Sequence, residues 1–254
     1  MKIAPVSVVI PTVDRGGLLD KAINSVLSQS LLPKELIIVN NGNQEIQFSD
    51  NNLIKVIRTE PYIGSSAARN IGIKESSSKY IAFLDDDDIW DKDFLKNFFD
   101  AIEKSMTIFD VYVGSLYRMK DSEKNYFFYK VFPNNPRLQR KVYFSNPGIG
   151  GQNFMASKRA LNFIGGFDEE LIGSEDRDIA ARFIEAGFKI ASIKTSKAIL
   201  CDHSGPRRRQ DRRLKGLMQF YSRHRLFMTP KEKFLFFFKF LDHVYKITRR
   251  KMNL

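Results

Sequence analysis

Short apolar runs separated by amphipathic stretches fill the first half of the chain. Four runs have the length and composition of buried strands, and they lie at residues 6–10, 36–39, 55–59 and 80–84. Apolar residues recur at helical spacing over 17–30, and helices are also expected over 65–75 and 91–105. Strands that alternate with helices in this way predict an α/β fold with a mostly parallel central sheet flanked by helices.

The second half of the chain has a less regular pattern. Its expected strands are 111–119, 126–131, 153–156, 190–193 and 198–201, with a charged turn at 120–124. One helix is expected through Ile164, and another opens near Gly173 and runs to about Ala186. The clearer α/β signal therefore lies in the first half.

Polar residues follow three of the expected strands at the point where each strand ends. These groups occupy residues 12–15, 40–43 and 85–88. Ligands of open α/β sheets bind beyond the carboxyl ends of the strands. We therefore expect the three groups to converge on one site.

Four consecutive aspartates, residues 85–88, directly follow the apolar run 80–84. Crowded carboxylates make one another harder to ionise, so such a cluster requires solvent or a cation. Oxygen donors suit Mg²⁺ or Mn²⁺, which share their remaining positions with water and substrate phosphates. The alternative is an acidic turn that caps the next helix, which would explain one aspartate better than four.

Composition describes a soluble globular chain of 254 residues, with 43% apolar and 28% charged residues. The single cysteine, Cys201, excludes an internal disulfide and fits a reducing compartment. The N-terminal residues lead directly into a strand pattern without a signal-peptide pattern, and no apolar run approaches the ~20 residues of a membrane span. These features predict a cytoplasmic protein.

The net charge of +12 is concentrated at the C-terminal end. Residues 207–254 contain fifteen Lys/Arg and three acids, which leaves 26 of each sign in residues 1–206. This distribution suggests that residues 1–206 carry the chemistry and that the basic tail, residues 207–254, binds an anionic surface.

The tail itself has the pattern of two helices, one ending near Met228 and one starting at Pro230. Aromatic and apolar residues share one broad face of the second helix: Phe234, Phe237, Phe238, Leu241, Val244 and Tyr245. Such a face between basic ends predicts a helix lying on an anionic membrane, peripheral to the inner face of the cell membrane. The alternative is a helix docked on the rest of the protein or on a second copy in a homo-oligomer. No recognised motif accompanies the charge, so nucleic acid is not an expected partner.

Four segments, in this order, resemble the family 2 glycosyltransferases of the GT-A fold, the bacterial surface-glycan type. They are VVIPT at 8–12, GSSAARN at 64–70, FLDDDD at 83–88, and GSEDRD at 173–178 with Arg182. The resemblance covers about residues 4–205. It implies a catalytic domain at 1–205, with a nucleotide-binding half at about 1–105 and an acceptor and catalytic half at about 106–205. Residues 206–254 then form the basic helical tail.

The resemblance implies transfer of a sugar from a nucleoside diphosphate sugar, with a UDP-sugar favoured, to a hydroxyl of a glycan or lipid-linked glycan. Asp176 would be the catalytic base of an inverting displacement, with Glu175 beside it at the helix N-terminus. Ordinary capping is the alternative role for that acidic segment. Asp87 would bind Mn²⁺ or Mg²⁺, and a late histidine, His203, is a second candidate ligand whose alternative is a structural or exposed role.

The same resemblance directs further residues to the nucleotide. Thr12, Asp14 and Arg15 would reach the base and ribose, and Asn41 would pair with the base, although relatives often carry acids there. Four more residues are expected to contact substrate: Arg69, Asp85, Asp86 and Glu175. Asp85 would lie nearer the ribose and uracil, whereas Asp86, like Asp88, could instead support the metal ligands from behind or cap the next helix. Arg69 would meet either the diphosphate or the aspartate cluster.

Two other functions fit parts of the pattern. A nucleotidyltransferase would use the same metal–nucleotide site, but it is expected to have a basic, glycine-rich phosphate loop, for which residues 12–17 supply only Arg15. A non-catalytic module would bind an anionic partner through its tail. Asp178 and Arg182 are expected to pair as structural supports.

Overall fold

A nine-stranded mixed sheet forms the centre of the protein in the computed structural model, which describes residues 3–46, 51–120, 122–201 and 210–252. The strands are β1 (Ile3–Thr12), β2 (Leu32–Asn40), β3 (Ile54–Arg58), β4 (Tyr80–Phe83), β5 (Asp88–Trp90), β6 (Val111–Lys120), β7 (Ser122–Val131), β8 (Phe154–Ser157) and β9 (Ile190–Leu200). Their order is β3-β2-β1-β4-β8-β6-β9-β5, with β7 paired to β6. Strands β1–β4, β6 and β9 share one direction and the other three run against it, so the predicted mostly parallel sheet is confirmed.

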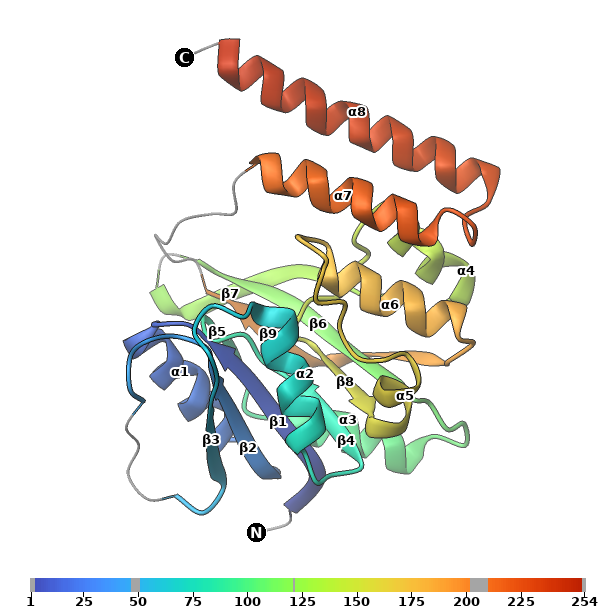
Figure 1. Cartoon of the computed structure of the whole chain (residues 1–254). Coiled ribbons are helices and arrows are strands. Elements are labelled where there is room, and N and C mark those ends of the chain that lie inside the picture. The colour runs from blue at the N-terminus through green and yellow to red at the C-terminus, as the bar shows by residue number, and fades with distance from the viewer. Residues whose placement is uncertain (1–2, 47–50, 121, 202–209, 253–254) are drawn as a thin grey trace.

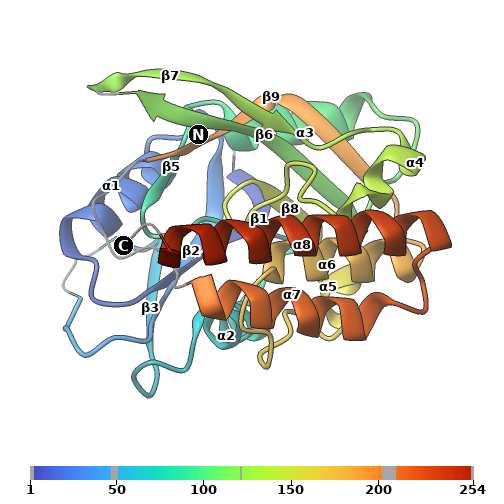
Figure 2. The same cartoon turned by 90° about the horizontal axis from the view of Figure 1, so that it is seen from above.

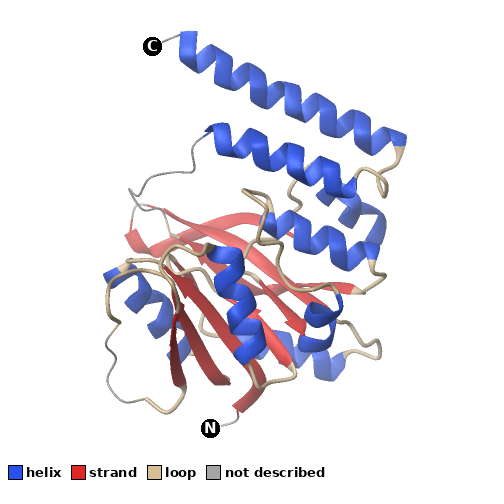
Figure 3. Cartoon of the chain, in the orientation of Figure 1, coloured by secondary structure: helices blue, strands red, loops and turns tan. Residues whose placement is uncertain are grey.

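Helices cover both faces of this sheet (Figure 3). One face carries α1 (Gly16–Leu27) and α3 (Phe94–Lys104), whose apolar residues share a core with alternate residues of β1 and β2. The other face carries α2 (Ser65–Glu75), α5 (Lys158–Phe163) and α6 (Glu175–Glu185). A short helix α4 (Pro136–Gln139) and a 3-10 turn at Arg140–Tyr143 follow β7. The sheet is thus buried on both sides, which explains the continuous apolar runs of its strands.

Close packing fixes how α2 sits on the sheet. A Cβ atom added at Gly72 would lie 2.3 Å from Cγ1 of Val9 in β1. Only glycine allows this approach, which brings the N-terminal part of α2, including Arg69, to the carboxyl ends of β1 and β4.

Two expected elements differ from the structure. The predicted strands 190–193 and 198–201 are one strand, β9, because its polar middle bulges: Gly114 of β6 faces Ile193, whereas Ser115 faces Lys197. The helix expected from residue 91 begins at Phe94, because residues 88–90 pair with β9 as β5. Strand β5 is only three residues long and begins at the last of the four carboxylates. It therefore shows no clear apolar periodicity and was not predicted from the sequence.

Two C-terminal helices, α7 (Gln210–His224) and α8 (Pro230–Met252), stack on α6, with α8 outermost (Figures 1 and 2). Phe220 and Phe236 are buried in the same core as α6. A bidentate contact joins Arg140 to Glu232 at the start of α8. The second helix is therefore docked on the body of the protein, and one face of it remains outside. The proposed boundary between residues 205 and 206 lies outside the described residues.

No helix in the described part of the chain combines the length and the apolar character needed to cross a bilayer.

Candidate active site

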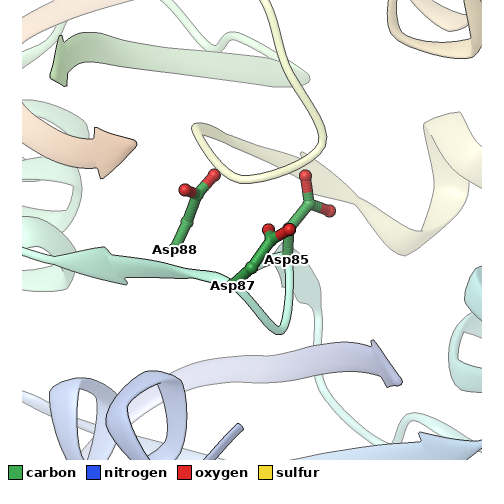
Figure 4. Close-up of side chains that lie close together, drawn as sticks. All are labelled: Asp85, Asp87 and Asp88. Carbon is green, nitrogen blue, oxygen red and sulfur yellow. The ribbon is translucent and has the colours of Figure 1, made fainter. Parts of the chain in front are cut away.

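Three carboxylates from the turn between β4 and β5 form a compact oxygen cluster. One oxygen each of Asp85, Asp87 and Asp88 lies within 4.8 Å of the others. Figure 4 shows the three side chains rising from the same side of this turn. The expected acidic cluster at a strand end is therefore present.

Asp88 is the most deeply placed member of the cluster. Burial, and then the charges of Asp85 and Asp87, raise the pKa of Asp88 well above its usual value, although its carboxylate accepts a hydrogen bond from the Cys201 backbone N–H at 2.9 Å. The capping alternative is wrong for this turn, because α3 begins only at Phe94 with Asp93 at its N-cap. Three crowded hard oxygen donors fit Mg²⁺ or Mn²⁺, which would offset their mutual repulsion.

Asp86 faces a different direction from its three neighbours. Its carboxylate accepts hydrogen bonds from Oγ1 of Thr12 at 2.8 Å and from the backbone N–H of Val13 at 3.4 Å. Burial raises the pKa of Asp86 to about 6, against the hydrogen bond from Thr12. Asp86 and Thr12 thus join the ends of β4 and β1 to each other. Their contact with substrate stays a prediction.

Arg69 at the start of α2 pairs with Asp85, one of the two partners expected for it. Burial opposes the charge of Arg69, but Asp85, Asp176 and Glu175 outweigh that effect and raise its pKa. The pair is covered by Gly151, where an added Cβ would lie 2.6 Å from Nη2 of Arg69 and 2.8 Å from Oδ1 of Asp85.

The end of β1 meets the aspartate turn, and the end of β2 meets the end of β1, where the Asn41 backbone N–H donates to the carbonyl of Thr12 at 3.0 Å. Nη1 of Arg15 lies 3.5 Å from Oδ2 of Asp87. Asp14, which has a φ of 49°, accepts hydrogen bonds from the Gln44 backbone N–H at 2.8 Å and from the hydroxyl of Tyr62 at 3.2 Å. A hollow of about 180 Å³ lies between the ends of β1 and β2. The convergence of the three polar groups is therefore confirmed.

Asn41 is buried at the end of β2. Neither atom of its side-chain amide has a hydrogen-bond partner among the described residues. A buried amide group without a hydrogen-bond partner costs about 1–3 kcal/mol of folding free energy. Asn41 carries this cost as long as no ligand pairs with its amide.

A cavity of about 360 Å³ opens over the aspartate cluster. The carboxylates of the aspartate cluster line it, and so does Asp176 from the first turn of α6. Arg118 of β6 and Lys130 of β7 add two cations to the lining. Asp176 therefore shares one cavity with the proposed metal ligands, while Glu175 is buried beside it.

The N-terminus of α6 is held by its neighbours. Asp178 pairs with Arg182, as expected from their spacing, and accepts a hydrogen bond from Nε2 of His224 at 2.9 Å. Burial would raise the pKa of Asp178, but His224 and Arg182 lower it below its usual value. Nη1 of Arg182 also donates to the carbonyls of Ile164 and Gly166. Asp178 and Arg182 thus act as structural supports.

Several residues of the site were missed or cannot be placed. Sequence reasoning did not assign Asp88 to the metal, nor Arg118 and Lys130 to the cavity. Arg118 and Lys130 lie in strands whose basic residues belong to no recognised motif. They reach the cavity only through the position of β6 and β7 in the sheet. His203, the second predicted metal ligand, lies outside the described residues.

Comparison with known proteins gives consistent matches. The sequence profile of glycosyl transferase family 2 matches residues 7–165, more than half of the chain. WcaA of Escherichia coli K12, a glycosyl transferase assigned to colanic acid biosynthesis, is 25% identical over 229 residues, covering 87% of this chain and 81% of WcaA. WfgD of Escherichia coli, a UDP-Glc:alpha-D-GlcNAc-diphosphoundecaprenol beta-1,3-glucosyltransferase, is 34% identical over 91 residues, covering 34% of this chain and 36% of WfgD.

The fold is also similar to a solved structure. TarS of S. aureus (residues 1–349, in complex with UDP-GlcNAc) superposes with a TM-score of 0.63 at 19% identity, covering 87% of this chain and 66% of that one. The likeness at this identity concerns the fold. The chain spans between 18% and 62% of the length of four other curated relatives it matches.

Proposed function

Because the chain belongs to glycosyl transferase family 2, we propose that it transfers a sugar from a nucleoside diphosphate sugar to a hydroxyl of a glycan or lipid-linked glycan. The observation that carries this proposal is the cavity that Asp176 lines together with three clustered carboxylates. A UDP-sugar is the favoured donor, since WfgD is named for UDP-Glc and the TarS structure contains UDP-GlcNAc.

Asp85, Asp87 and Asp88 would hold Mn²⁺ or Mg²⁺ at the floor of this cavity. A divalent cation there supplies Lewis acidity to the departing diphosphate. Arg69 stays charged through its contacts with Asp85 and orients that carboxylate. Arg15 lies beside Asp87 and would bring a further positive charge to the nucleotide.

Asp176 would act as the catalytic base. The acceptor oxygen attacks the anomeric carbon and forms the new bond as its proton passes to the Asp176 carboxylate. The bond between the anomeric carbon and the diphosphate oxygen breaks, and its electron pair leaves with the diphosphate. This single displacement inverts the anomeric configuration. Asp176 lies in the first turn of α6, where the helix dipole stabilises negative charge.

The nucleoside would occupy the hollow at the ends of β1 and β2. Thr12, Asp14 and Arg15 line that hollow, and Asn41 lies next to it in sequence and structure. A base edge that engaged the amide of Asn41 would relieve its unpaired state. Loss of UDP binding in Asn41→Ala would support this placement.

Replacing Asp176 by asparagine tests the proposed base. The variant keeps the size and hydrogen-bonding capacity of the side chain but cannot accept the proton. We expect UDP binding in the presence of Mn²⁺ to stay within about twofold, and sugar transfer to fall about a hundredfold to ten-thousandfold. Glu103→Gln, at an exposed position near the end of α3, is the matched control. Unchanged turnover in Asp176→Asn would remove Asp176 from this role.

We further propose that α8 attaches the protein to the inner face of an anionic membrane. Its outward face exposes Phe234, Phe237, Phe238, Leu241 and Tyr245, whereas Phe236 is buried beneath them. Lys231, Lys246 and Arg249 are exposed along the same helix. An apolar stripe flanked by cations, on a helix whose other face is docked, matches a helix at the membrane interface.

A further inference from the structure

A second cavity, of about 700 Å³, adjoins the one over the aspartate cluster. It lies between β6, β7 and α6 on one side and α7 and α8 on the other. Arg118, Lys130, Asn146 and Asp176 line both cavities. The proposed base therefore stands where the two cavities meet, which is the position required of a group between donor and acceptor.

This second cavity is strongly cationic. Arg118, Lys130, Arg177 and Lys239 line it, whereas Asp176 is the one acid in its described lining. None of the four cations pairs with a carboxylate among the described residues. The charge excess is therefore not cancelled within the part of the chain that the structure describes.

The contacts of these cations are neutral ones. Nζ of Lys239 donates to Oγ of Ser145 at 2.9 Å, and Nζ of Lys130 donates to the carbonyl of Asn146 at 3.4 Å. Nε of Arg118 is buried without a hydrogen-bond partner. Arg177 donates to a backbone carbonyl, and burial lowers its pKa to about 10, so it remains charged at neutral pH. Arg177 is buried, Arg118 and Lys130 are half-buried, and Lys239 is exposed at the mouth of the cavity. Clustered cations without acidic partners are typical of sites that receive an anion.

The wall formed by the C-terminal helices is apolar. This wall consists of Leu217 from α7 and of Phe236 and Phe240 from α8, and Phe144 from an adjoining loop also lines the cavity. The cavity thus combines a cationic side next to Asp176 with an apolar side next to α8. A neutral sugar carries neither an anionic group for the cationic side nor a long apolar chain for the apolar side.

We propose that this cavity receives an acceptor whose sugar is joined through a phosphate or diphosphate to an apolar chain. Arg118, Lys130 and Lys239 bind the phosphate oxygens, and the apolar chain lies against Phe236 and Phe240. The acceptor hydroxyl is thereby presented to Asp176. This inference rests on the proposed glycosyl transfer, and it adds the chemical class of the acceptor.

The test must distinguish the acceptor from two other phosphate-bearing ligands, the sugar donor and membrane phospholipids. Arg118 and Lys130 also line the cavity over the aspartates, so either could serve the diphosphate of the donor. Lys239 lines only the second cavity, which makes Lys239→Gln the diagnostic variant. Lys104→Gln, an exposed lysine in the last turn of α3, is the matched control. Phospholipid head groups are the other source, and they are tested separately with vesicles.

The test uses the full chain, saturated with UDP and Mn²⁺, and farnesyl diphosphate as the probe in calorimetric titration. We expect wild type and Lys104→Gln to bind the probe, and Lys239→Gln to bind it at least tenfold more weakly. All three should bind UDP equally and bind anionic phospholipid vesicles equally. Inorganic pyrophosphate, which lacks the apolar chain, should bind more weakly than the probe.

Three results would overturn the inference. Probe binding that UDP abolishes would assign the probe to the donor site. Equal probe binding by Lys239→Gln and wild type would remove Lys239, and vesicle binding lost in Lys239→Gln would assign it to the membrane. If Lys239→Gln does not fold, as judged by its unfolding temperature, Lys130→Gln takes its place, and equal probe binding there counts against the inference. Failure of UDP itself to bind would instead contradict the proposed function.

Discussion

At the scale of single residues, the site depends on how closely carboxylates and cations approach one another. Gly151 lies over the Arg69–Asp85 pair, and a Cβ at Gly151 would come within 3 Å of both side chains. Gly151→Ala should therefore displace Asp85 and weaken binding of Mn²⁺ with UDP by about tenfold to a hundredfold. Thermal shift with and without the ligands measures this change.

Gly17→Ala is the matched control for that experiment. No atom lies within 4 Å of a Cβ added at Gly17, which sits in α1. Alanine in a helix favours the folded state by about 0.5–1 kcal/mol relative to glycine, so the control should be slightly stabilised and keep its ligand binding. Equal ligand binding by both variants would mean that Asp85 does not contribute to the metal site.

Asp88 is the residue that sequence reasoning placed least well. Its oxygen belongs to the same cluster as those of Asp85 and Asp87. We expect Asp88→Asn to weaken Mn²⁺ binding about tenfold or more in calorimetric titration, because one anionic donor is lost. Asp100→Asn, at an exposed position of α3, should leave the affinity unchanged. Wild-type affinity in Asp88→Asn would limit the ligands to Asp85 and Asp87.

At the scale of elements, α6 and α7 are joined through one buried histidine. Nε2 of His224 contacts Asp178 at 2.9 Å, and Nδ1 contacts Glu185 at 2.8 Å. Burial alone would lower the pKa of His224, but the hydrogen bonds and charges of the two carboxylates raise it above its usual value. The histidine is thus held in its charged form between two acids.

The linkage gives a pH window for this contact. Because folding raises the pKa of His224, the charged histidine stabilises the folded state fully below its pKa in the unfolded chain, about 6.5. That stabilisation is lost as pH rises through the pKa of His224 in the folded state. The lowered pKa of Asp178 means that its contribution is present above about 3.8 and is lost as pH falls through its folded value. The contact should therefore stabilise most between these two limits.

His224→Gln tests this window. We expect the variant to lose about 3–5 kcal/mol of unfolding free energy at pH 6, because a buried pair is broken. Denaturant unfolding across pH should show the difference from wild type shrinking at high pH. His243→Gln, on α8, is the control. A difference that is the same at pH 6 and pH 10 would contradict the charged state of His224.

The elements that the sequence predicted best are those with one clear period. Strands β1, β2 and β4 are buried on both faces, so their apolar runs stand out. The motifs at the ends of β1 and β4, together with those at the starts of α2 and α6, lead to the family that the comparison confirms. The short strand β5 and the bulge in β9 have no such period, because pairing across the sheet decides them. Arg118 and Lys130 reach the site for the same reason. Long-range pairing cannot be read from local spacing.

At the scale of the whole molecule, the C-terminal helices are part of the core as well as a proposed attachment surface. Phe220 and Phe236 lie in the core that α6 contributes to, so removing residues after 205 would also remove core packing. Loss of vesicle binding after such a truncation would not separate attachment from unfolding. Substitutions on the outward face of α8 make that separation.

Phe237 and Phe238 are 59% and 67% exposed on that face, so replacing both by serine should leave the core intact. Each aromatic ring that enters a bilayer interface contributes up to about 1.5–3 kcal/mol, so sedimentation with anionic vesicles should fall by at least about tenfold. Phe163→Ser, at a 72% exposed position of α5, is the matched control. Binding that persists in the double variant, with UDP affinity unchanged, would mean that a surface other than the outward face of α8 attaches the protein to the vesicles.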